Sequence, residues 1–378
     1  MFTLSQALEA IKNKPEFSVK ERGSYTVIDY VLNNKETFVG SNEEETLILL
    51  NLRGTAFDNE SGRIIRLGFE KFFNFGEFPE SDKQLNFDDD HLITQKLDGS
   101  CIFPIYANEG TFFGTRAGVT DISKMAEDFA LSTDIYYCDF IHACMTIYNA
   151  TPIFEFCSRK NRVVLDYPED MLVLTGIRYI DTGVYFDYRA MSVFASSYDI
   201  PVVKRIDSIL QNSFNSFKES VSGLVDDEGV VIRFESGICA GAMVKMKATA
   251  YCLQHKALDQ LKFAKDVLLL SLNGLLDDVL PLLAVDNFNR VSMFVDEFAS
   301  AVSAKDIDIQ NEYFKYEDIE SQKDFALAIA NHPYKQFMFG IRAGKNCFDM
   351  LVNYCKVNCG TQAKCDDLQK FLGMTVKY

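Results

Sequence analysis

The stretch Leu92-Ile93-Thr94-Gln95-Lys96-Leu97-Asp98-Gly99-Ser100 leads from an apolar run into a lysine, an acid and a glycine. The apolar start of this stretch predicts a strand that delivers Lys96 to a partly buried place. Gly99 has no Cβ and would let the backbone that follows approach a ligand closely. A lysine amine in such a place can serve as a nucleophile when burial or neighbouring cations lower its pKa.

Around this stretch, the chain up to about Ala250 alternates short apolar runs with turns. Cys101–Tyr106 and Thr111–Thr115 predict a hairpin. Further strands are expected at Thr46–Leu52, Arg63–Phe69, Ile153–Cys157, Met171–Tyr179, Gly229–Phe234 and Met243–Lys247. Helices are expected where the apolar spacing shifts to three and four, at Asp121–Asp139 and Val203–Ser220. The pattern predicts an α+β fold with a largely antiparallel sheet.

The remainder of the chain has a helical pattern with no competing strand pattern. The candidate helices are Gln254–Leu272, Asn287–Ala304, Tyr316–Ala330, Tyr334–Val357 and Asp366–Leu372. We therefore expect two domains, 1–255 with the antiparallel sheet and 256–378 composed only of helices.

Composition narrows the class of protein. The 378 residues carry a formal charge of −16, so a nucleic-acid partner would require basic groups gathered in a groove. The apolar run Val267–Leu276 is too short to span a bilayer, and the N-terminus lacks an apolar core of signal-peptide length. The 10 cysteines include no C-x-x-C pair. We expect a cytoplasmic protein with reduced thiols, and the irregular spacing of Cys355, Cys359 and Cys365 argues against zinc.

Three further segments carry charges that could serve chemistry. Glu155 stands between two phenylalanines, and on a strand it faces away from both rings. Glu228 lies directly before an apolar strand, where loops often contribute metal or ribose contacts. Lys245 and Lys247 share one face of a strand, where two like charges repel unless an anion lies between them. Taken singly, each segment is also compatible with an ordinary solvent-exposed face or turn.

Taken in this order, the segments resemble the motifs of covalent nucleotidyltransferases, the ligases and capping enzymes that form a lysyl-nucleotide. Asn51-Leu52-Arg53-Gly54 and Glu70-Lys71-Phe72-Phe73-Asn74 narrow the resemblance to the RNA ligase 1 family of T-even phages. So does Phe154-Glu155-Phe156 followed by Asn161-Arg162-Val163-Val164. The resemblance covers roughly residues 40–260. It implies an adenylyltransferase domain with an ATP-grasp-like antiparallel sheet, followed by a helical domain that helps to choose the RNA.

The resemblance also implies an activity and a role for each site residue. The enzyme would be an ATP-dependent RNA ligase, and Lys96 would carry AMP to an RNA 5′-phosphate, which a 3′-hydroxyl then attacks. Lys245 and Lys247 would assist catalysis by balancing charge on the α-phosphate and the leaving group. The residues implied in ATP binding are Arg53, Lys71, Lys96, Gly99, Arg116, Glu155, Lys245 and Lys247. Glu228 would contact a metal, Mg²⁺ or alternatively Mn²⁺.

Several finer expectations follow from the same resemblance. Cleaved transfer RNA would be the natural substrate in RNA repair, and the protein would be a monomer in the cytoplasm of a host cell if a bacteriophage encodes it. The family usually has a lysine in the segment after the nucleophile, where this chain has Arg116. Arginine keeps the charge and changes its geometry.

Other functions remain as alternatives. A DNA ligase or a capping guanylyltransferase shares the chemistry, but these enzymes append a β-rich barrel where this chain has a helical pattern. A non-catalytic RNA-binding protein would have lost an essential group, yet Lys96, Glu155, Glu228, Lys245 and Lys247 are all present. A purely structural protein would not need this set of charges.

Overall fold

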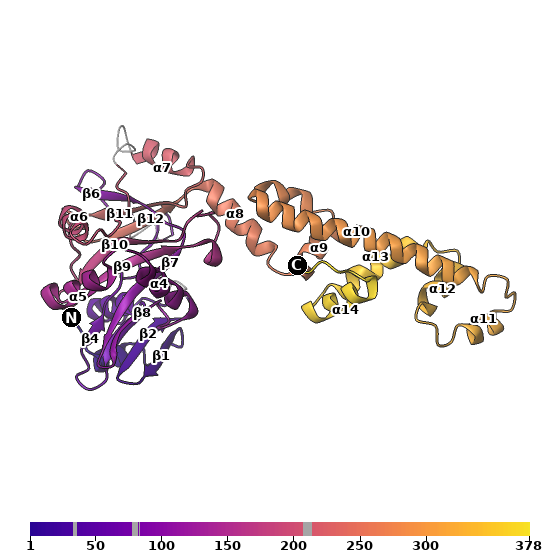
Figure 1. Cartoon of the computed structure of the whole chain (residues 1–378), viewed down its shortest axis with the longest axis horizontal. Helices are drawn as coiled ribbons and strands as arrows, with labels where there is room; N and C mark the ends of the chain where they lie inside the picture. Colours follow the sequence, from indigo (N-terminus) through magenta and orange to yellow (C-terminus); the bar gives the residue numbers. More distant parts are fainter. Residues whose placement is uncertain (33–35, 78–81, 83, 207–213) are drawn as a thin grey trace. The chain divides into compact units, whose positions relative to one another are not determined.

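The computed structural model describes residues 1–32, 36–77, 82, 84–206 and 214–378. These residues form two compact units, Met1–Cys252 and Leu253–Tyr378 (Figure 1). The first unit contains sheets and helices, whereas the second is built of helices. The expected order, an α+β part followed by an all-α part, is confirmed.

The first unit contains three four-stranded sheets. The first sheet has the order β1 (Phe17–Arg22), β2 (Tyr25–Tyr30), β3 (Thr55–Asp58), β4 (Ile64–Arg66). The second has the order β10 (Met171–Tyr179), β9 (Ala150–Cys157), β7 (Ser100–Ala107), β8 (Gly110–Gly114). The third has the order β5 (Phe73–Asn74), β12 (Met243–Lys247), β11 (Gly229–Phe234), β6 (His91–Gln95). Neighbouring strands are antiparallel except β5 and β12, which pair in parallel.

Helices cover these sheets. They are α1 (Leu4–Ala10), α2 (Glu43–Asn51), α4 (Asp121–Ser132), α5 (Tyr137–Tyr148), α6 (Tyr188–Ser196) and α7 (Phe214–Ser222), with a short 3-10 turn η1 (Arg159–Asn161). Helices α4, α5 and α6 pack on the second sheet around a buried cluster that includes Phe140, Phe154 and Leu174. Helix α8 (Thr249–Gln260) runs across the residue at which the two units divide.

Most expected strands are present. The hairpin of β7 and β8 pairs Phe103 with Gly114 and closes at Ala107 and Gly110. The expected strands at residues 171–179, 229–234 and 243–247 coincide with β10, β11 and β12. Strand β6 ends at Gln95 in the third sheet and β7 begins at Ser100 in the second. Lys96 therefore lies where the chain crosses from one sheet to another.

Three expectations for the first unit differ from the structure. The expected helix Asp121–Asp139 is divided, because α4 ends at Ser132 and α5 begins at Tyr137. Thr46–Leu52 was expected as a strand, but residues 43–51 form helix α2. Asn42 caps this helix by accepting a hydrogen bond from the Glu45 amide (2.8 Å), and acidic residues fill its first turn, where the helix dipole favours them. The expected helix Val203–Ser220 is wrong in its first part, because residues 201–206 run extended beside β6 and β10, and the described part of α7 spans Phe214–Ser222. Residues 207–213 lie outside the described residues.

The second unit consists of helices. They are α9 (Ala264–Leu272), α10 (Val285–Phe314), α11 (Gln322–Ala328), α12 (Lys335–Arg342), α13 (Cys347–Asn358) and α14 (Gln362–Leu372), with 3-10 turns η2 (Leu276–Asp278) and η3 (Leu280–Leu282). The expected helix Tyr334–Val357 is two helices, because Gly344 has a φ of +78° and Asn346 caps α13. The expected helix Gln254–Leu272 is likewise divided, between α8 and α9.

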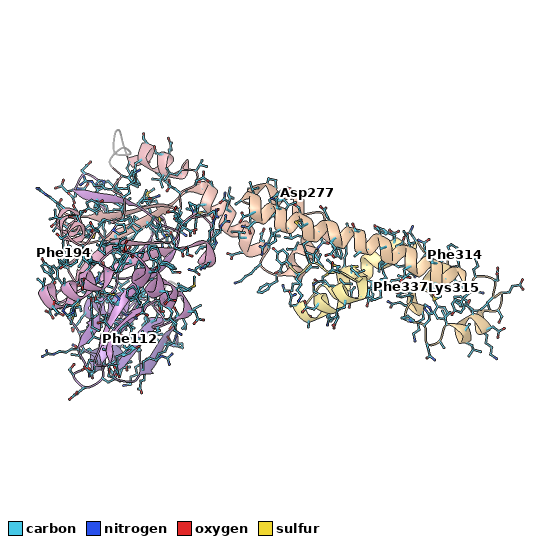
Figure 2. All side chains as sticks on the ribbon, viewed as in Figure 1. Phe112, Phe194, Asp277, Phe314, Lys315 and Phe337 are labelled. Atoms are coloured by element: carbon cyan, nitrogen blue, oxygen red, sulfur yellow. The ribbon has the colours of Figure 1, made fainter. Side chains whose placement is uncertain are left out.

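The core of the second unit is apolar. Phe294, Phe298 and Leu351 are buried there together with the thiols of Cys355 and other cysteines. The ring of Phe337, labelled in Figure 2, lies 5.5 Å from that of Tyr354. All 10 cysteines are free thiols, and the described residues hold no cluster of three or more side chains suited to a metal ion.

No helix in the described ranges has both the length and the apolar character that crossing a membrane requires.

Candidate active site

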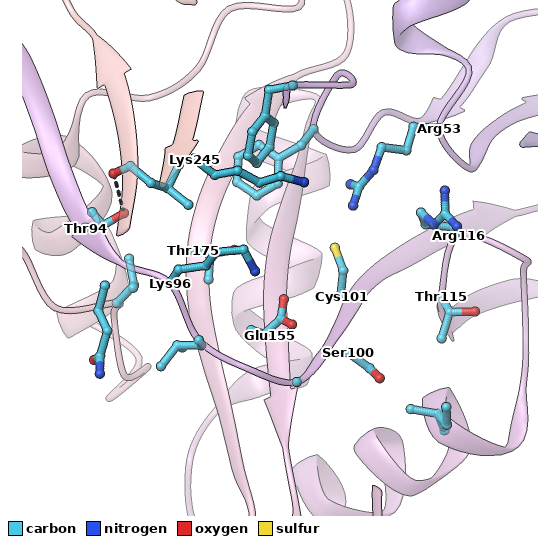
Figure 3. A pocket seen from close by; sticks show the side chains of 18 of the residues that line it. Arg53, Thr94, Lys96, Ser100, Cys101, Thr115, Arg116, Glu155, Thr175 and Lys245 are labelled. Carbon is cyan, nitrogen blue, oxygen red and sulfur yellow. Dashed lines mark hydrogen bonds between the residues drawn. The ribbon is translucent and has the colours of Figure 1, made fainter. Parts of the chain in front are cut away.

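A cavity of about 510 Å³ opens in the first unit around the crossing between β6 and β7 (Figure 3). Six of the nine residues that the sequence singled out line it: Arg53, Lys96, Gly99, Arg116, Glu155 and Lys245. The other three are not among the lining residues. Glu228 contacts Lys96 and Lys247, and the charges of Lys71 and Lys247 lower the pKa of Lys245. Motifs spread over some 200 residues of sequence are thus brought together.

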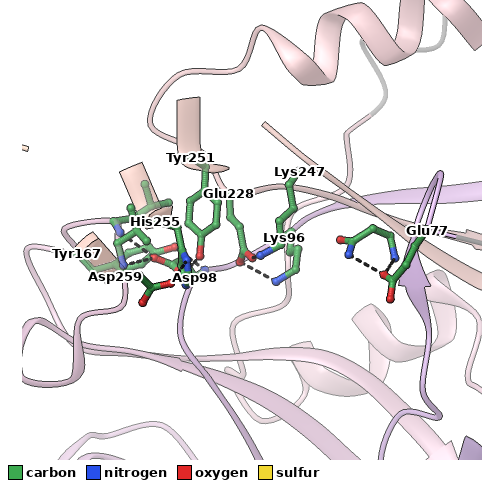
Figure 4. Close-up of polar contacts among 12 residues, drawn as sticks. Glu77, Lys96, Asp98, Tyr167, Glu228, Lys247, Tyr251, His255 and Asp259 are labelled. Carbon is green, nitrogen blue, oxygen red and sulfur yellow. Dashed lines mark hydrogen bonds and ion pairs between the residues drawn. The ribbon is translucent and has the colours of Figure 1, made fainter. Parts of the chain in front are cut away.

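Lys96 is held at this cavity by its backbone and by its amine. Its amide donates a hydrogen bond to the carbonyl of Gly229 (2.8 Å), which extends the pairing of β6 with β11. Its Nζ donates to Oε2 of Glu228 at 2.6 Å, and Oε1 of Glu228 lies 3.0 Å from Nζ of Lys247 (Figure 4). The Glu228 side chain is only 4% exposed. One buried carboxylate therefore bridges the candidate nucleophile and a second lysine.

Glu155 lies on β9, opposite Cys101 of β7. Burial raises the pKa of Glu155 to about 7, Lys96 and Arg53 act in the opposite direction, and Glu228 adds to the rise. Its carboxyl group faces the same space as the Lys96 amine (Figure 3). A carboxyl group that titrates near neutral pH can both accept a hydrogen bond and exchange a proton there.

Cations surround the rest of the cavity. Burial, together with repulsion from Lys71, Lys96, Lys247 and Arg53, lowers the pKa of Lys245 to about 8. Burial also lowers the pKa of Lys71, whose ammonium lies 4.7 Å from the ring centre of Phe73. So many positive charges in mutual reach are unfavourable without an anion. The arrangement is suited to a polyphosphate.

Arg116 occupies the wall beside the Arg53-Gly54 turn. Its Nη1 lies 3.3 Å from Oδ1 of Asp29, and its guanidinium is 4.4 Å from the ring centre of Tyr30. Gly54 has a φ of +73°, and a Cβ at Gly54 would lie 2.6 Å from Cα of Arg116. The glycine after Arg53 is thus required so that the two arginine segments can pack together.

The acid of the opening stretch has a structural role that sequence reasoning did not assign. Asp98 is 4% exposed, and its Oδ2 accepts hydrogen bonds from the amides of Val164 (2.8 Å) and Leu165 (2.7 Å). Its Oδ1 accepts one from the hydroxyl of Tyr251 (2.7 Å, Figure 4). Asp98 therefore fastens the Lys96 loop to the segment after β9 and to α8.

Gly99 also differs from its expected role. A Cβ at Gly99 would lie 2.3 Å from the carbonyl oxygen of Phe156, so the close approach that requires glycine is to strand β9. Gly99 still lines the cavity, as does Phe72 of the segment Glu70–Asn74, whereas Phe73 packs against Phe38. Asp29 and Cys101 line the cavity as well and carry no motif that could have identified them.

Comparison with known proteins identifies a family for this chain. A family model described as RNA ligase matches residues 51–257, which is more than half of the chain. A protein of Thermovibrio ammonificans named "Putative RNA ligase" is 26% identical over 318 residues, covering 80% of this chain and 78% of its own.

Two solved structures are also similar. An archaeal ATP-dependent RNA ligase (form 2) aligns with a TM-score of 0.45 and 14% identity, over 99% of this chain and 96% of its own. A mutant RNA ligase of Naegleria gruberi with ATP and Mn has a TM-score of 0.39 and 14% identity, over 50% of this chain and 58% of its own. At these scores the assignment rests on the family match alone. The chain belongs to the RNA ligase family, which confirms the predicted family and the prediction of an RNA ligase.

Proposed function

We propose that this RNA ligase works through a lysyl-AMP intermediate on Lys96 and joins RNA 5′-phosphate to 3′-hydroxyl ends, with broken transfer RNA as its natural substrate. The observation that supports this best is the position of the Lys96 amine. It lies at a 510 Å³ cavity whose lining also includes Arg53, Arg116 and Lys245. A lysine amine and several cationic side chains thus line one cavity, as transfer of a nucleotide from ATP to lysine requires.

The first step transfers AMP to the enzyme. The Lys96 amine attacks the α-phosphorus of ATP, an N–P bond forms, the bond to the bridging oxygen breaks, and pyrophosphate leaves. For a lysine with the reference pKa of ~10.4, losing the proton at pH 7 costs ~4.6 kcal/mol. Glu228 accepts a hydrogen bond from this amine at 2.6 Å, so a carboxylate lies within reach of the proton.

The later steps use the same groups. An oxygen of the RNA 5′-phosphate attacks the α-phosphorus and the N–P bond breaks, which regenerates the Lys96 amine. The 3′-hydroxyl of the second RNA end then attacks the 5′-phosphate, and AMP leaves. We propose that Arg53, Lys71 and Arg116 bind the phosphates of ATP, that Lys245 and Lys247 balance charge on the α-phosphate, and that Glu155 contacts the ribose.

A divalent metal, Mg²⁺ or Mn²⁺, fits beside Glu228. Both oxygens of this carboxylate are engaged by Lys96 and Lys247, and the described residues form no group of three or more acidic, histidine or cysteine side chains suited to a metal ion. Mg²⁺ commonly binds through one carboxylate and the substrate phosphates while it keeps several waters. When bound, the metal would neutralise phosphate oxygens of ATP.

The test is incubation with α-labelled ATP and Mg²⁺, followed by denaturing separation. Label should stay on the protein and be lost in Lys96→Ala, while Lys12→Ala, a control at an exposed lysine (66% exposed side chain), should label like the natural chain. Label that persists in Lys96→Ala would reject the nucleophile. Label from GTP and not from ATP would favour a capping reaction.

A further inference from the structure

We propose that two exposed lysines, Lys160 and Lys204, bind phosphates of the RNA strand that receives AMP. Lys204 lies on residues 201–206, of which Val203 lines the cavity, and Lys160 lies on residues 158–165, which are hydrogen-bonded to the lining residue Ser100. This inference deepens the proposed function and rests on it, because the RNA 5′-phosphate must reach the α-phosphate carried by Lys96.

The first segment is fastened to the loop that carries Lys96. Asn161 donates a hydrogen bond from Nδ2 to Oγ of Ser100 (2.8 Å), and Ser100 lines the cavity. Farther along, Val164 and Leu165 are held by the buried carboxylate of Asp98. Lys160 precedes Asn161 and is exposed. Its backbone is therefore fixed one residue from a group that touches the cavity wall.

The second segment is fastened on the other side of Lys96. The Gln95 amide donates to the carbonyl of Lys204 (2.9 Å), and the Val203 amide donates to the carbonyl of Leu174 (2.8 Å). The Val203 side chain is buried and lines the cavity, whereas Lys204 is exposed. Lys204 is therefore the next residue in the chain after one that lines the cavity.

One apolar cluster supports both segments. Its buried members are Leu97, Cys157, Val173 and Val203, and Tyr167 packs against it. Cys157 directly precedes the first segment and Val203 belongs to the second. The Tyr167 hydroxyl also accepts a hydrogen bond from the Asp98 amide (3.0 Å, Figure 4). The two lysines thus stand on a common rim of the site.

The two lysines differ from a neighbouring cation on this rim in that they are not paired with an acidic side chain among the described residues. Arg159 is occupied, because its Nε and Nη2 both bind Asp166 at 2.7 Å. Glu169 and Asp170 follow in the same loop and are acidic, so the positively charged part of this loop is its beginning. Neither Lys160 nor Lys204 has an ion-pair partner within the part of the chain that the structure describes.

RNA phosphates are the ligand that fits these two lysines. Neither of them lines the cavity, so the triphosphate of ATP is not their partner. A chain with a formal charge of −16 needs local cations to hold an RNA backbone near the reacting phosphate. Two lysines on fixed backbone at the rim meet that need.

The experiment compares the double variant Lys160→Gln/Lys204→Gln with a control of equal charge change, Lys12→Gln/Lys20→Gln, on α1–β1 of the same unit. Each protein is first adenylylated with α-labelled ATP, and the pure lysyl-AMP form is then mixed with 5′-phosphorylated single-stranded RNA. We expect self-adenylylation of both variants within about twofold of the natural chain. The RNA concentration for half-maximal AMP transfer should rise about tenfold in the rim variant only.

Salt dependence provides a second readout. Each phosphate contact to single-stranded nucleic acid contributes a slope of about 0.7 in log affinity against log salt, so the rim variant should lose about 1.4 from that slope. Unchanged RNA dependence in the rim variant, or an equal change in the control, would overturn the inference. A natural chain that transfers no label to itself would reject the proposed function first, and this inference with it.

Discussion

The two units of this chain bury different kinds of side chain. All of the buried polar and charged residues in the described chain belong to the first unit, among them Arg66, Asp98 and Glu228. The core of the second unit is made of apolar side chains and thiols, such as Leu351 and Cys359. Burying a charge is costly unless it is paired, so a unit that buries many of them is one in which a charged ligand can be bound strongly.

The same difference appears within a few residues of the Lys96 loop. Asp98 is buried with donors on both of its oxygens, and this pairing makes it a structural anchor. Lys245 is partly buried among other cations and lacks such compensation. A buried charge that is fully paired stabilises the fold, whereas a buried charge without an opposite partner in the protein is stabilised when a charged ligand binds.

The largest expected effect is a loss of stability in the second unit that leaves the activity of the first unit unchanged. Leu351→Ala removes a fully buried side chain from α13 and should destabilise the helical unit by about 2–5 kcal/mol. Because no cavity residue lies in that unit, self-adenylylation should stay within about twofold of the natural chain. Thermal unfolding followed together with transfer of label from ATP measures both quantities. Loss of labelling while the first unit remains folded would break the division of labour.

The next effect concerns the paired acid. Asp98→Ala leaves the amides of Val164 and Leu165 without their acceptor and should lower the free energy of unfolding of the first unit by about 3 kcal/mol. Tyr251→Phe removes one donor and keeps the other two, and should cost about 1 kcal/mol. Denaturant unfolding of the two variants tests this ranking. Equal losses of unfolding free energy in the two variants would mean that the hydrogen bonds from the Val164 and Leu165 amides contribute little to stability.

How far the sequence predicts this arrangement depends on whether the signal is local. Strands β10 and β11 could be predicted to the residue, because turn-forming or acidic residues bound their apolar runs. Helix α2 could not, because a short apolar run is compatible with a strand or a helix, and the cap at Asn42 decides between them.

The same distinction applies to the site. Lys96, Glu155 and Lys245 could be selected because motifs mark them, and they line one cavity. The anchoring role of Asp98 could not, since its partners lie 66 or more residues away and are backbone amides and a tyrosine hydroxyl. Cys101 lines the cavity only because β7 pairs with β9, which no pattern in its own segment indicates.

A smaller effect should come from the unpaired cation. The pKa of Lys245 is lowered to about 8 by burial, whereas the bound anion of ATP would favour its protonated form. ATP binding then takes up a proton above pH 8, so affinity should fall about tenfold between pH 7 and pH 9. Equilibrium binding to Lys96→Ala, which cannot react, measures this fall. Adding Lys245→Arg should flatten the profile, because arginine keeps its charge throughout, and an identical fall in that variant would assign the proton to another group.

The last effect is on stability and concerns Glu155. Its pKa is raised from 4.5 to about 7, chiefly by burial, so the folded chain holds a proton that the unfolded chain has already released. The stability that this proton provides is present below pH 4.5 and is lost as pH rises through 7. Glu155→Gln cannot ionise, so its melting temperature should fall less than that of the natural chain between pH 4.5 and pH 7. Parallel profiles would show that Glu155 is already ionised across this range, and its excess charge would then be compensated by the cations of the cavity, as that of Asp98 is by its donors.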